Sequence, residues 1–444
     1  MKFSEAVQYL LSLGHETLAM KLGLRNSELL LAALGKPQAS VRSVQIAGTN
    51  GKGSTAVMLD SICRAAGIKT GLYTSPHLTS ITERILINGV PISEDEFATL
   101  VTFVRETSEL LVTRETIEAL PTFFEQVTAA ALLAFAPARV NLALLETGLG
   151  GRLDATTAAG AEIVALTPIA MDHEQYLGNT IEEIAAEKAA IIRPGVRAVI
   201  AEQDPRALQV ILDRCAETNV EPVESARIGS RAEASAEGRF CVTFQTNQHV
   251  YDRLWLGLLG QHQSQNAATV ISLAEILNES GYQISQQAIR EGIESARHPG
   301  RLELIPGAPG YLLDGAHNPA GALALRKYLD DYARRPLTII FGAMRDKQLD
   351  QMAGILFPVA DLVVLTEINN PRSATSESLV RLASSAGVSR VVTASSSEDA
   401  LHQALTATES SGLICVTGSL YLIGELRSRL MLRSAANRNA EPAS

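Results

Sequence analysis

No stretch of this 444-residue chain is apolar over the roughly 18 residues that a membrane-spanning helix needs, so we expect no such helix. Near the N-terminus Glu5 and Gln8 interrupt the apolar residues, which argues against a signal peptide. Cysteine is scarce, and the four residues at positions 63, 215, 241 and 415 show neither Cys-x-x-Cys nor metal-ligand spacing. We therefore expect buried free thiols and a protein of the reducing cytoplasm.

Basic clusters are absent as well. Lysine and arginine number 38 against 48 aspartates and glutamates, which gives a net charge of −10 and a pI of about 5.4. A chain without a basic patch is not expected to have nucleic acid as its main partner. Its 46% apolar and 19% charged residues are typical of a globular protein. Because 444 residues exceed what one hydrophobic core usually serves, two domains are expected.

Apolar runs alternate with segments of helical periodicity through the first half of the chain. Strands are expected at 44–47, just before Tyr73–His77, at 141–146 and at 162–167, and helices over much of 1–35, at 54–66 and at 123–136. This alternation predicts a doubly wound α/β domain. Ligand-binding residues should then gather at the carboxyl ends of its strands.

The same rhythm starts again after His298-Pro299-Gly300, a sequence typical of a hinge. Strands are expected at 311–313, 337–341, 362–365, 390–393 and 413–416. A second, smaller parallel α/β domain follows from this pattern. We place the domains at 1–297 and 298–432.

Two polar segments are expected to be irregular. Residues 226–238 are rich in glycine, alanine and serine and predict a surface turn, followed by paired strands at 240–244 and 250–259. Residues 433–444 lack apolar periodicity and predict a disordered tail.

The most informative segment is 47–55, which reads Ala-Gly-Thr-Asn-Gly-Lys-Gly-Ser-Thr directly after an apolar run. A glycine-rich turn between a strand and a helix aims backbone N–H groups and the helix N-terminus at anionic oxygens. Lys52 can reach a terminal phosphate, and Ser54 or Thr55, where we expect the helix to begin, can hold Mg²⁺. The expected nucleotide-binding residues are Gly48, Thr49, Asn50, Gly51, Gly53, Ser54 and Thr55, with Lys52 as a catalytic residue.

This loop differs from the usual P-loop. That motif reads G-x-x-x-x-G-K-[ST], whereas only two residues separate Gly48 from Gly51 here, and Gly53 stands between the lysine and the hydroxyls. A bare glycine turn would be weak support for nucleotide binding. The lysine and the hydroxyls that follow it make the prediction much more specific.

Acidic and polar residues follow the other expected strands. Glu146 ends a four-residue apolar run, as a Walker-B acid does, and is either a Mg²⁺ ligand or a helix-capping glutamate. Gly148 to Asp154 form a glycine-rich turn that lets backbone approach a ligand closely. His173, after the strand that ends near Thr167, is either a packed residue or a metal ligand, although Mg²⁺ prefers oxygen.

Other candidates have equally ordinary alternatives. Lys188 lies in a strong helix-forming segment and could be a surface lysine that pairs with Glu183 or Glu187. Asp314 and His317 could meet ribose or phosphate, or could serve only a turn, because Asp-Gly and Asn-Pro are turn dipeptides. The remaining candidates are Arg301, just past the hinge, and the segment Arg345–Lys347, whose alternative is a solvated loop.

Together these motifs resemble the folylpolyglutamate synthase and dihydrofolate synthase family of the Mur ligase superfamily. The loop at 47–54 is similar to the loop of the whole superfamily. The narrower resemblance rests on Tyr73–Leu78, Glu83–Ile85, Ile87–Gly89, Glu146–Thr156, Asp172-His173, Glu187–Ala189, Pro299–Arg301 and Asp314–Pro319. The motifs run from about residue 22 to 373, which is most of the chain.

The resemblance implies an ATP-dependent ligase that adds L-glutamate to dihydropteroate, to reduced folates or to both, through an acyl phosphate. It implies a P-loop ATP-binding domain and a Rossmann-like C-terminal domain with the nucleotide between them. No nucleic acid or membrane partner is implied, and the protein is expected to work as a monomer in the cytoplasm.

The resemblance also implies roles for individual residues. Two Mg²⁺ ions are expected at Ser75, Glu146 and His173, and Lys188 matches a catalytic lysine that such ligases carry as a carbamate. ATP contacts are expected from Asn266, Arg301 and Asp314, while His317 and Lys347 would lie near the phosphates or the glutamate. Leu24 and Arg25, within the segment Leu22–Arg25, would cap the pteridine, and Asp154 would lie on its other side.

The chain departs from the family pattern in several places: Thr157 replaces the usual asparagine, Pro168 a serine, His298 an aromatic residue and Ser373 an alanine. These changes bear on pteridine preference and leave the ATP-binding residues intact. Two alternatives stay open at this point. One is another superfamily ligase with a different carboxylate substrate, and the other is a nucleotide-binding regulator, although no N-K-x-D guanine motif is present.

Overall fold

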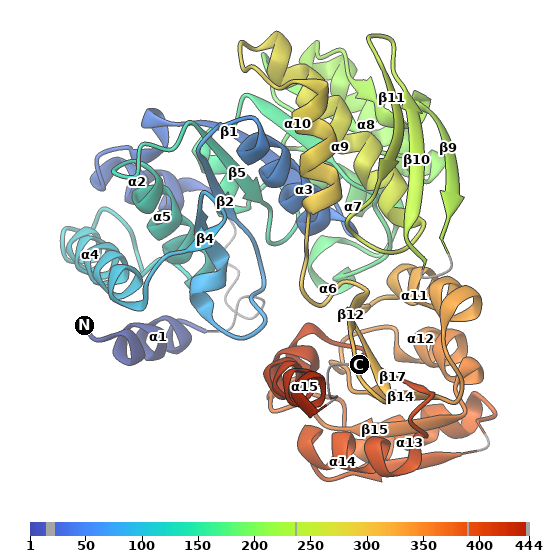
Figure 1. Ribbon diagram of the computed structural model, residues 1–444. Coiled ribbons are helices and arrows are strands. Elements are labelled where there is room, and N and C mark those ends of the chain that lie inside the picture. Colours follow the sequence, from blue (N-terminus) through green and yellow to red (C-terminus); the bar gives the residue numbers. More distant parts are fainter. Residues whose placement is uncertain (15–22, 236–237, 389, 441–444) are drawn as a thin grey trace. The chain divides into compact units, whose positions relative to one another are not determined.

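The structure, a computed structural model, describes residues 1–14, 23–235, 238–388 and 390–440. The chain divides into two compact units, which are described separately (Figure 1). The N-terminal unit comprises Met1–Ser230, Thr243–Leu254 and Gln265–Ala296, and the C-terminal unit comprises Arg231–Val242, Trp255–Ser264 and Arg297–Ser444. The main boundary therefore lies beside the expected hinge, but two short segments around the three-stranded sheet belong to the second unit.

The N-terminal unit is built on an eight-stranded sheet in the order β4-β3-β2-β5-β1-β6-β7-β8. Its strands are β1 (Arg42–Ala47), β2 (Thr70–Tyr73), β3 (Ile85–Ile87), β4 (Val90–Pro91), β5 (Leu142–Glu146), β6 (Ile163–Leu166), β7 (Arg197–Ile200) and β8 (Val223–Glu224). All pairs are parallel except β2–β3 and β3–β4. The expected doubly wound α/β domain is confirmed.

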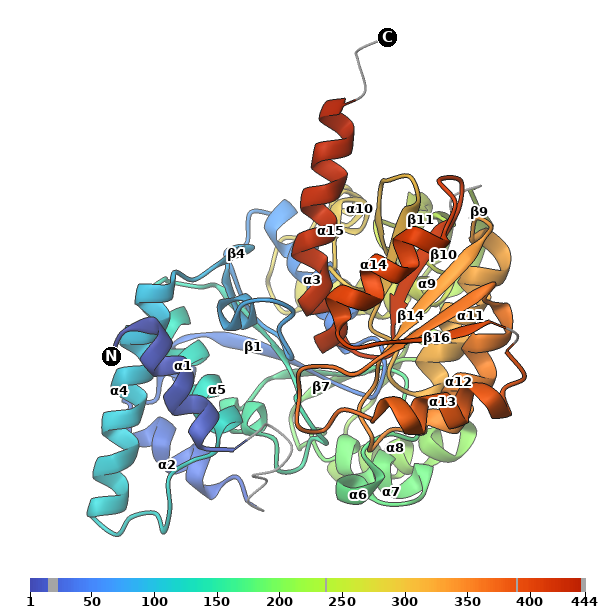
Figure 2. The ribbon, with the colours of Figure 1, turned by 90° about the horizontal axis from the view of Figure 1, so that it is seen from below.

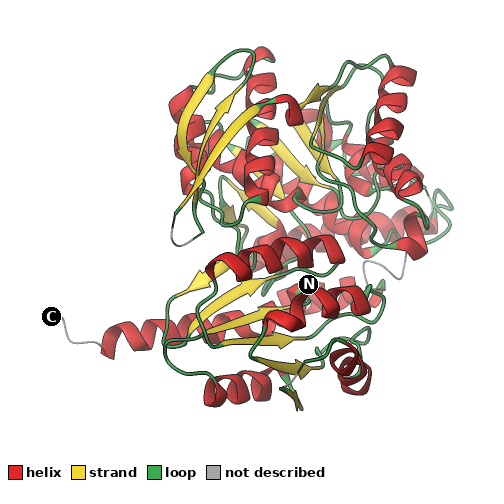
Figure 3. Ribbon diagram, turned by 90° about the vertical axis from the view of Figure 1, so that its right-hand side faces the viewer, coloured by secondary structure: helices red, strands yellow, loops and turns green. Residues whose placement is uncertain are grey.

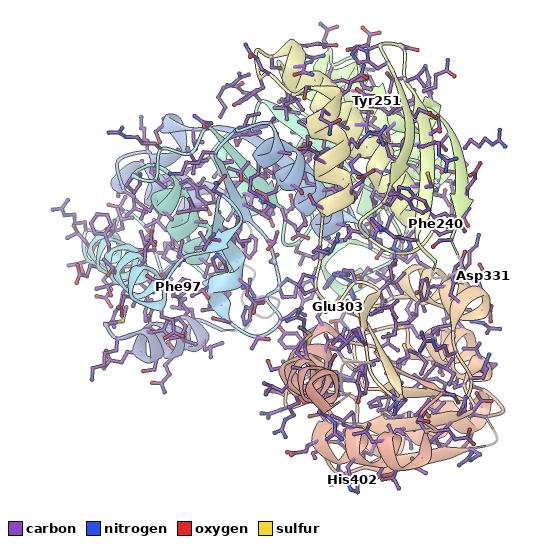
Figure 4. All side chains as sticks on the ribbon, viewed as in Figure 1. Phe97, Phe240, Tyr251, Glu303, Asp331 and His402 are labelled. Atoms are coloured by element: carbon purple, nitrogen blue, oxygen red, sulfur yellow. The ribbon has the colours of Figure 1, made fainter. Side chains whose placement is uncertain are left out.

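Helices cover this sheet and supply most of its core. They are α1 (Phe3–Ser12), α2 (Arg25–Ala33), α3 (Lys52–Ala65), α4 (Glu94–Thr113), α5 (Phe123–Phe135), α6 (Glu174–Leu177), α7 (Ile181–Ala189), α8 (Pro205–Thr218), α9 (His262–Glu279) and α10 (Gln286–Ser295), with short 3₁₀ turns at 37–40, 81–84, 155–159 and 225–227. Phe97 on α4, labelled in Figure 4, is fully buried. Its ring meets that of Phe3 edge to face, with the ring centroids 5.9 Å apart. Helix α5 starts at a capping box of Thr122 and Glu125, which satisfies orphan N–H groups at its first turn.

The order of the strands determines where the chemistry can lie. β1 is central and pairs with β5 on one side and with β6 on the other, with Ile46 opposite Glu146 and Ala47 opposite Leu166. The carboxyl ends of these three strands therefore meet at one edge of the sheet. The chain leaves β1 toward one side and β5 toward the other, which makes this edge a topological switch point.

The C-terminal unit has a six-stranded sheet in the order β12-β13-β17-β14-β15-β16, parallel except for β12. Helices lie on both faces of this sheet (Figure 3). Its elements are β12 (Glu303–Ile305), β13 (Gly310–Asp314), α11 (Pro319–Tyr332), β14 (Leu337–Phe341), α12 (Leu349–Leu356), a 3₁₀ turn at 357–359, β15 (Leu362–Thr366), α13 (Ser376–Ser385), β16 (Val391–Ala394), α14 (Ser397–Ala407), β17 (Leu413–Thr417) and α15 (Leu420–Ala440). Each expected strand of this half is present within one residue.

The segment expected to be a surface turn at 226–238 contains a strand instead. β9 (Gly229–Ala234) pairs with β10 (Phe240–Gln245), and β10 with β11 (Val250–Trp255). Every residue of β9 is exposed, so the strand is held by backbone pairing and shows none of the apolar alternation that signals a strand in the sequence. Residues 236–237 lie outside the described part.

The chain end also differs from the expected disordered tail. Helix α15 continues through Ala440, as one long helix in Figure 2. Residues 433–440 contain alanine and arginine, which are good helix formers, and the first proline comes only at position 442. The remaining residues of the expected tail, 441–444, are outside the described part. No helix among the described residues is long and apolar enough to cross a membrane.

Helices α3 and α10 of the N-terminal unit pack closely at a glycine (Figure 1). A Cβ atom on Gly292 would lie 2.4 Å from the Ile62 Cα atom and 2.5 Å from its nitrogen. Ser61 and Ser295 hydroxyls meet at 3.1 Å at the same contact. Backbone of α3 cannot move away from a side chain here without disturbing the sheet beneath it.

We predict that Gly292→Ala lowers the free energy of unfolding by about 1–3 kcal/mol, because overpacking outweighs the helix propensity of alanine. The control is Gly354→Ala in α12, where a Cβ would meet nothing within 4 Å. That variant should gain about 0.5–1 kcal/mol. Denaturant unfolding measures both, and a stabilised Gly292→Ala would contradict the close packing.

Candidate functional site

The loop after β1 turns directly into helix α3. The helix begins at Lys52, two residues before the expected start, because Gly51 takes a left-handed φ of 87° and caps it. The Thr55 N–H is the amide that bonds to the Gly51 carbonyl, at 2.9 Å. The amides of Lys52, Gly53 and Ser54 precede it, so α-helix geometry gives them no acceptor within the helix and aims them out of its N-terminus.

Asn266 on α9 lies against this turn. A Cβ atom on Gly51 would come within 2.4 Å of the Asn266 Oδ1 atom, and Asn266 is itself buried. The structure thus brings together Asn266 and the glycine loop, two groups that are more than 200 residues apart in the sequence and were both expected to bind ATP.

The loop is braced by the segment that follows β6. Thr49 and Asn50 N–H groups both donate to the Pro168 carbonyl, at 3.0 and 3.1 Å. The Thr49 hydroxyl donates to the Ala170 carbonyl and accepts from the Ala170 N–H, both at 3.1 Å. Because residue 168 accepts these bonds through its carbonyl, the missing N–H group of proline does not weaken them. Gly48 lies so close that a Cβ atom would be 2.8 Å from the Thr167 carbonyl oxygen.

Two lysines share one backbone acceptor in the loop. The Nζ atom of Lys188 donates to the Gly48 carbonyl at 2.9 Å, and the Nζ atom of Lys52 donates to the same carbonyl at 3.2 Å and to that of Thr49 at 3.1 Å. Lys188 is 4% exposed, so the interpretation as a surface lysine is wrong. Burial, and then the charge of Lys52, lower the pKa of Lys188 to about 7.

Glu146 ends β5 and is buried. Its Oε2 atom accepts a hydrogen bond from the Ser75 N–H at 3.0 Å, which brings two of the expected metal ligands together. Glu146 lies at the same edge of the sheet as the glycine loop, because β1 and β5 pair with Ile46 opposite Glu146.

His173 lies at the same edge, after β6. It takes a left-handed φ of 52° just before the short helix α6. Its neighbour Asp172 is buried and accepts the His173 N–H at 2.9 Å, with the ring Nε2 atom 3.9 Å from the second carboxylate oxygen. Among the described residues, no group of three His, Cys, Asp or Glu side chains could hold a metal ion by itself. A metal here would therefore need other oxygen donors, such as Ser75 or a bound phosphate.

Asp154 has an internal role. Its Oδ2 atom accepts the N–H groups of Gly148 and Leu149 at 2.9 and 3.0 Å, and its Oδ1 atom accepts the N–H and hydroxyl of Thr156 at 3.0 and 2.5 Å. The side chain is 5% exposed, and burial raises its pKa although all of these bonds lower it. The structure thus uses this carboxylate to fold the glycine-rich turn. The expected contact with a pteridine stays a prediction.

The other two residues expected to cap the pteridine lie where α2 begins. Leu24 precedes the helix and Arg25 is its first residue, with an exposed side chain. Leu22 lies outside the described residues. Their role in binding a pteridine therefore remains a prediction.

In the C-terminal unit Asp314 closes a turn at the end of β13. Its oxygens accept the N–H groups of Leu302, at 2.9 Å, and Ala316, at 3.0 Å. Arg301 donates from its guanidinium to the Gly315 carbonyl at 3.3 Å. Burial raises the pKa of Asp314, and the nearby Arg301 charge opposes that shift.

His317 follows β13 and Lys347 follows β14, two strands of the same unit with β17 between them. The Nδ1 atom of His317 lies 2.8 Å from the Gly315 carbonyl, which can only accept, so Nδ1 carries the proton. Lys347 is half-buried, and its loop is held by an ion pair of 2.7 Å between Asp346 and Arg372. The other two residues of the segment, Arg345 and Asp346, are exposed, so the alternative of a solvated loop stays open and the role of Lys347 remains a prediction.

Comparison with known proteins identifies the family. The profile of the Mur ligase middle domain matches residues 46–274, and that of the Mur ligase glutamate ligase domain matches residues 300–420. The dihydrofolate synthase/folylpolyglutamate synthase of Bacillus subtilis is 37% identical over 423 residues, which cover 94% of this chain and 97% of that protein. The chain belongs to the folylpolyglutamate synthase/dihydrofolate synthase family of Mur ligases.

Solved structures of the family share this fold. The folylpolyglutamate synthase of Mycobacterium tuberculosis complexed with ADP superposes with a TM-score of 0.89 at 34% identity, covering 96% of this chain and 98% of that one. FolC of Escherichia coli in complex with DHPP and ADP gives a TM-score of 0.86 at 29% identity, covering 99% of each chain. The family, the two α/β parts and the ligase class expected from the sequence are confirmed.

Glu83 belongs to a motif of the family resemblance, but its structural role was not predicted from the sequence. Glu83 accepts the N–H groups of Leu78, Thr79 and Ser80, at 2.9 to 3.3 Å, and so fixes the segment just after Ser75. The signal was present, because Ser80-x-x-Glu83 has the spacing of a capping box. A motif that closes a loop rather than starting a long helix is easily overlooked.

We predict that Gly48→Ala weakens ADP binding by at least about tenfold, because a Cβ atom cannot fit against the Thr167 backbone without moving the loop. Calorimetric titration with ADP measures this affinity. The control is Gly195→Ala, where φ is also positive, at 85° against 146° for Gly48, but the space around the added carbon is open. Equal affinity of Gly48→Ala and wild type would contradict the described loop.

Proposed function

We propose that this chain joins L-glutamate to the carboxylate of dihydropteroate, of reduced folates, or of both, with cleavage of ATP to ADP and phosphate. The single observation that carries the proposal is the meeting of Lys52, Lys188 and the glycine loop at the sheet edge that also holds Glu146. The names of the relatives support the substrate, and structures of two of them hold ADP.

The chemical problem is a poor leaving group. A carboxylate cannot release oxide, so its oxygen first attacks the γ-phosphorus of ATP and ADP departs. The glutamate amine then attacks the acyl phosphate carbonyl, loses a proton, and phosphate leaves as the amide forms. Lys52 and the amides at the start of α3 are suited to stabilise the charge on the transferred phosphoryl group.

The residues present fit Mg²⁺. Ser75 and Glu146 supply oxygen donors, and His173 lies after β6, on the other side of β1. Mg²⁺ in nucleotide sites is usually held by one or two carboxylates together with water and phosphate oxygens, so few protein ligands are needed. When bound, one or two such ions would offset phosphate charge. The Thr55 hydroxyl is fully buried and has no hydrogen-bond partner among the described residues, which supports its assignment to the ligand site.

Lys188 has the properties that carbamylation requires. Carbon dioxide reacts with a neutral amine, and a pKa of about 7 leaves much of Lys188 neutral at physiological pH. The reaction forms an N–C bond and releases a proton. The carbamate retains one N–H group, so its bond to the Gly48 carbonyl can persist, while its negative charge attracts Lys52. The added oxygens would also supply hard donors for Mg²⁺.

We predict that Lys52→Ala lowers turnover by a factor of about 10³ or more, because it removes a charge aimed at the transferred phosphoryl group. ADP release is measured with Mg²⁺, ATP and glutamate, with dihydropteroate in one reaction and tetrahydrofolate in another. Lys69→Ala, which changes an exposed lysine of the same unit, is the control. The proposal would be contradicted if the wild-type protein released no ADP with either pteridine, or if Lys52→Ala kept full activity.

We predict that the protein in ¹³C-bicarbonate gives a carbamate carbon signal that is lost in Lys188→Arg. A group whose pKa is lowered to about 7 is neutral above that pH and protonated below it. The signal should therefore fall as the pH is lowered through about 7. A spectrum of wild type identical to that of Lys188→Arg at every pH would exclude the carbamate.

A further inference from the structure

A buried polar network lies beneath the glycine-rich turn. Gln45, in the centre of β1, is completely buried. Its Nε2 atom lies 3.0 Å from the Thr156 hydroxyl and 2.7 Å from the Thr157 hydroxyl, with the Thr147 hydroxyl farther away at 3.4 Å. A polar side chain at the middle of a parallel sheet is unusual, because such strands are normally apolar on both faces.

The directions of the hydrogen bonds from Gln45 to Thr156 and Thr157 are fixed. The Thr156 hydroxyl gives its single proton to Asp154, and the Thr157 hydroxyl gives its proton to the Gly151 carbonyl at 2.7 Å. Both hydroxyls must therefore accept from Gln45, whose amide has two protons to donate. If the amide were flipped, its oxygen would face the hydroxyl oxygens of Thr156 and Thr157. Neither hydroxyl has a proton left to donate to it.

This arrangement leaves the amide oxygen of Gln45 without a hydrogen bond among the described residues. This oxygen is buried. Leaving such an acceptor unsatisfied is unfavourable by about 1–3 kcal/mol. Violations of this kind concentrate at functional sites, where a local loss supports a required geometry.

The network reaches the helix that carries Lys188. Gly151 packs so tightly there that a Cβ atom on it would lie 2.8 Å from the Lys188 carbonyl oxygen and 2.9 Å from that of Glu187. The next residue, Arg152, donates its N–H to the Glu187 carbonyl at 2.9 Å. Any shift of the turn is therefore transmitted to the backbone of Lys188.

We infer that Gln45, Thr156 and Thr157 are positioning residues, which hold the turn against α7 and so keep Lys188 at the Gly48 carbonyl. The inference rests on the proposed function for its effect on turnover. The side chains of the three residues make their hydrogen bonds within the protein.

The test compares Thr157→Val with Thr157→Ser. Valine has the shape of threonine without the hydroxyl, whereas serine retains the hydroxyl and loses a methyl group. In Thr157→Val we expect kcat to fall by about tenfold or more through misplacement of a catalytic group. The affinity for ADP, measured by calorimetry, should stay within about twofold, because the loop itself is braced by Pro168 and Ala170. Thr157→Ser should keep kcat within about twofold of wild type.

Hydrogen–deuterium exchange gives a second readout that needs no substrate. The amides of Gly148 and Leu149, which donate to Asp154, should exchange faster in Thr157→Val and at the wild-type rate in Thr157→Ser. The exchange measurement remains a valid test of the inference even if the proposed substrates are wrong. If Thr157→Val does not fold, Thr156→Val and Thr156→Ser repeat the comparison on the other branch. Unchanged exchange in the valine variant, or equal loss of kcat in both variants of a pair, would overturn the inference.

Discussion

The parallel pairing of β1 with β5 on one side and β6 on the other is the constraint on which the site depends. The register places Ile46 beside Glu146 and Ala47 beside Leu166, so three loops leave the sheet at one edge. One carries the glycines, one begins after the buried acid, and one braces the glycine loop through Pro168 and Ala170. A slip of one residue in either pair would turn the side chains of a strand to the other face and separate these groups.

Two lysine side chains of the site lie close together, and their positive charges repel each other. Lys188 is buried beside Lys52, and both ammonium groups share the Gly48 carbonyl, an arrangement that no argument from stability would favour. The lowered pKa of Lys188 is the visible consequence of this arrangement. The proposed carbamate changes the sign of the interaction, because a negative group then lies beside Lys52. A bound polyphosphate would act in the same direction.

Much of the architecture was predictable because it is encoded locally. The apolar runs at 141–146 and 337–341 and the turn residues between them specify strands whatever surrounds them. Helix α3 begins two residues before the predicted start. A glycine at position 51 allows the left-handed conformation that caps the helix, but the sequence alone does not show that Gly51 adopts it. The strand β9 was missed because nothing in its exposed sequence distinguishes it from a turn.

Residue roles were harder to predict than elements. The burial of Lys188 depends on which face of α7 the sheet and the glycine loop cover, and helical periodicity around it did not show that. Asp154 was identified as important, but its four hydrogen bonds to the turn appear only once the chain is folded. The Gln45 network has no sequence signal at all, since a lone glutamine in an apolar strand has many explanations.

The central claim is that a carboxylate oxygen is passed to phosphate during ligation. The most direct test uses dihydropteroate, or tetrahydrofolate, labelled with ¹⁸O in the reacting carboxylate, together with ATP, glutamate and the wild-type protein. The account predicts that ¹⁸O appears in the released phosphate, seen as an isotope shift in its ³¹P resonance. Phosphate released without the label, with all of the ¹⁸O retained in the pteridine compound, would contradict it.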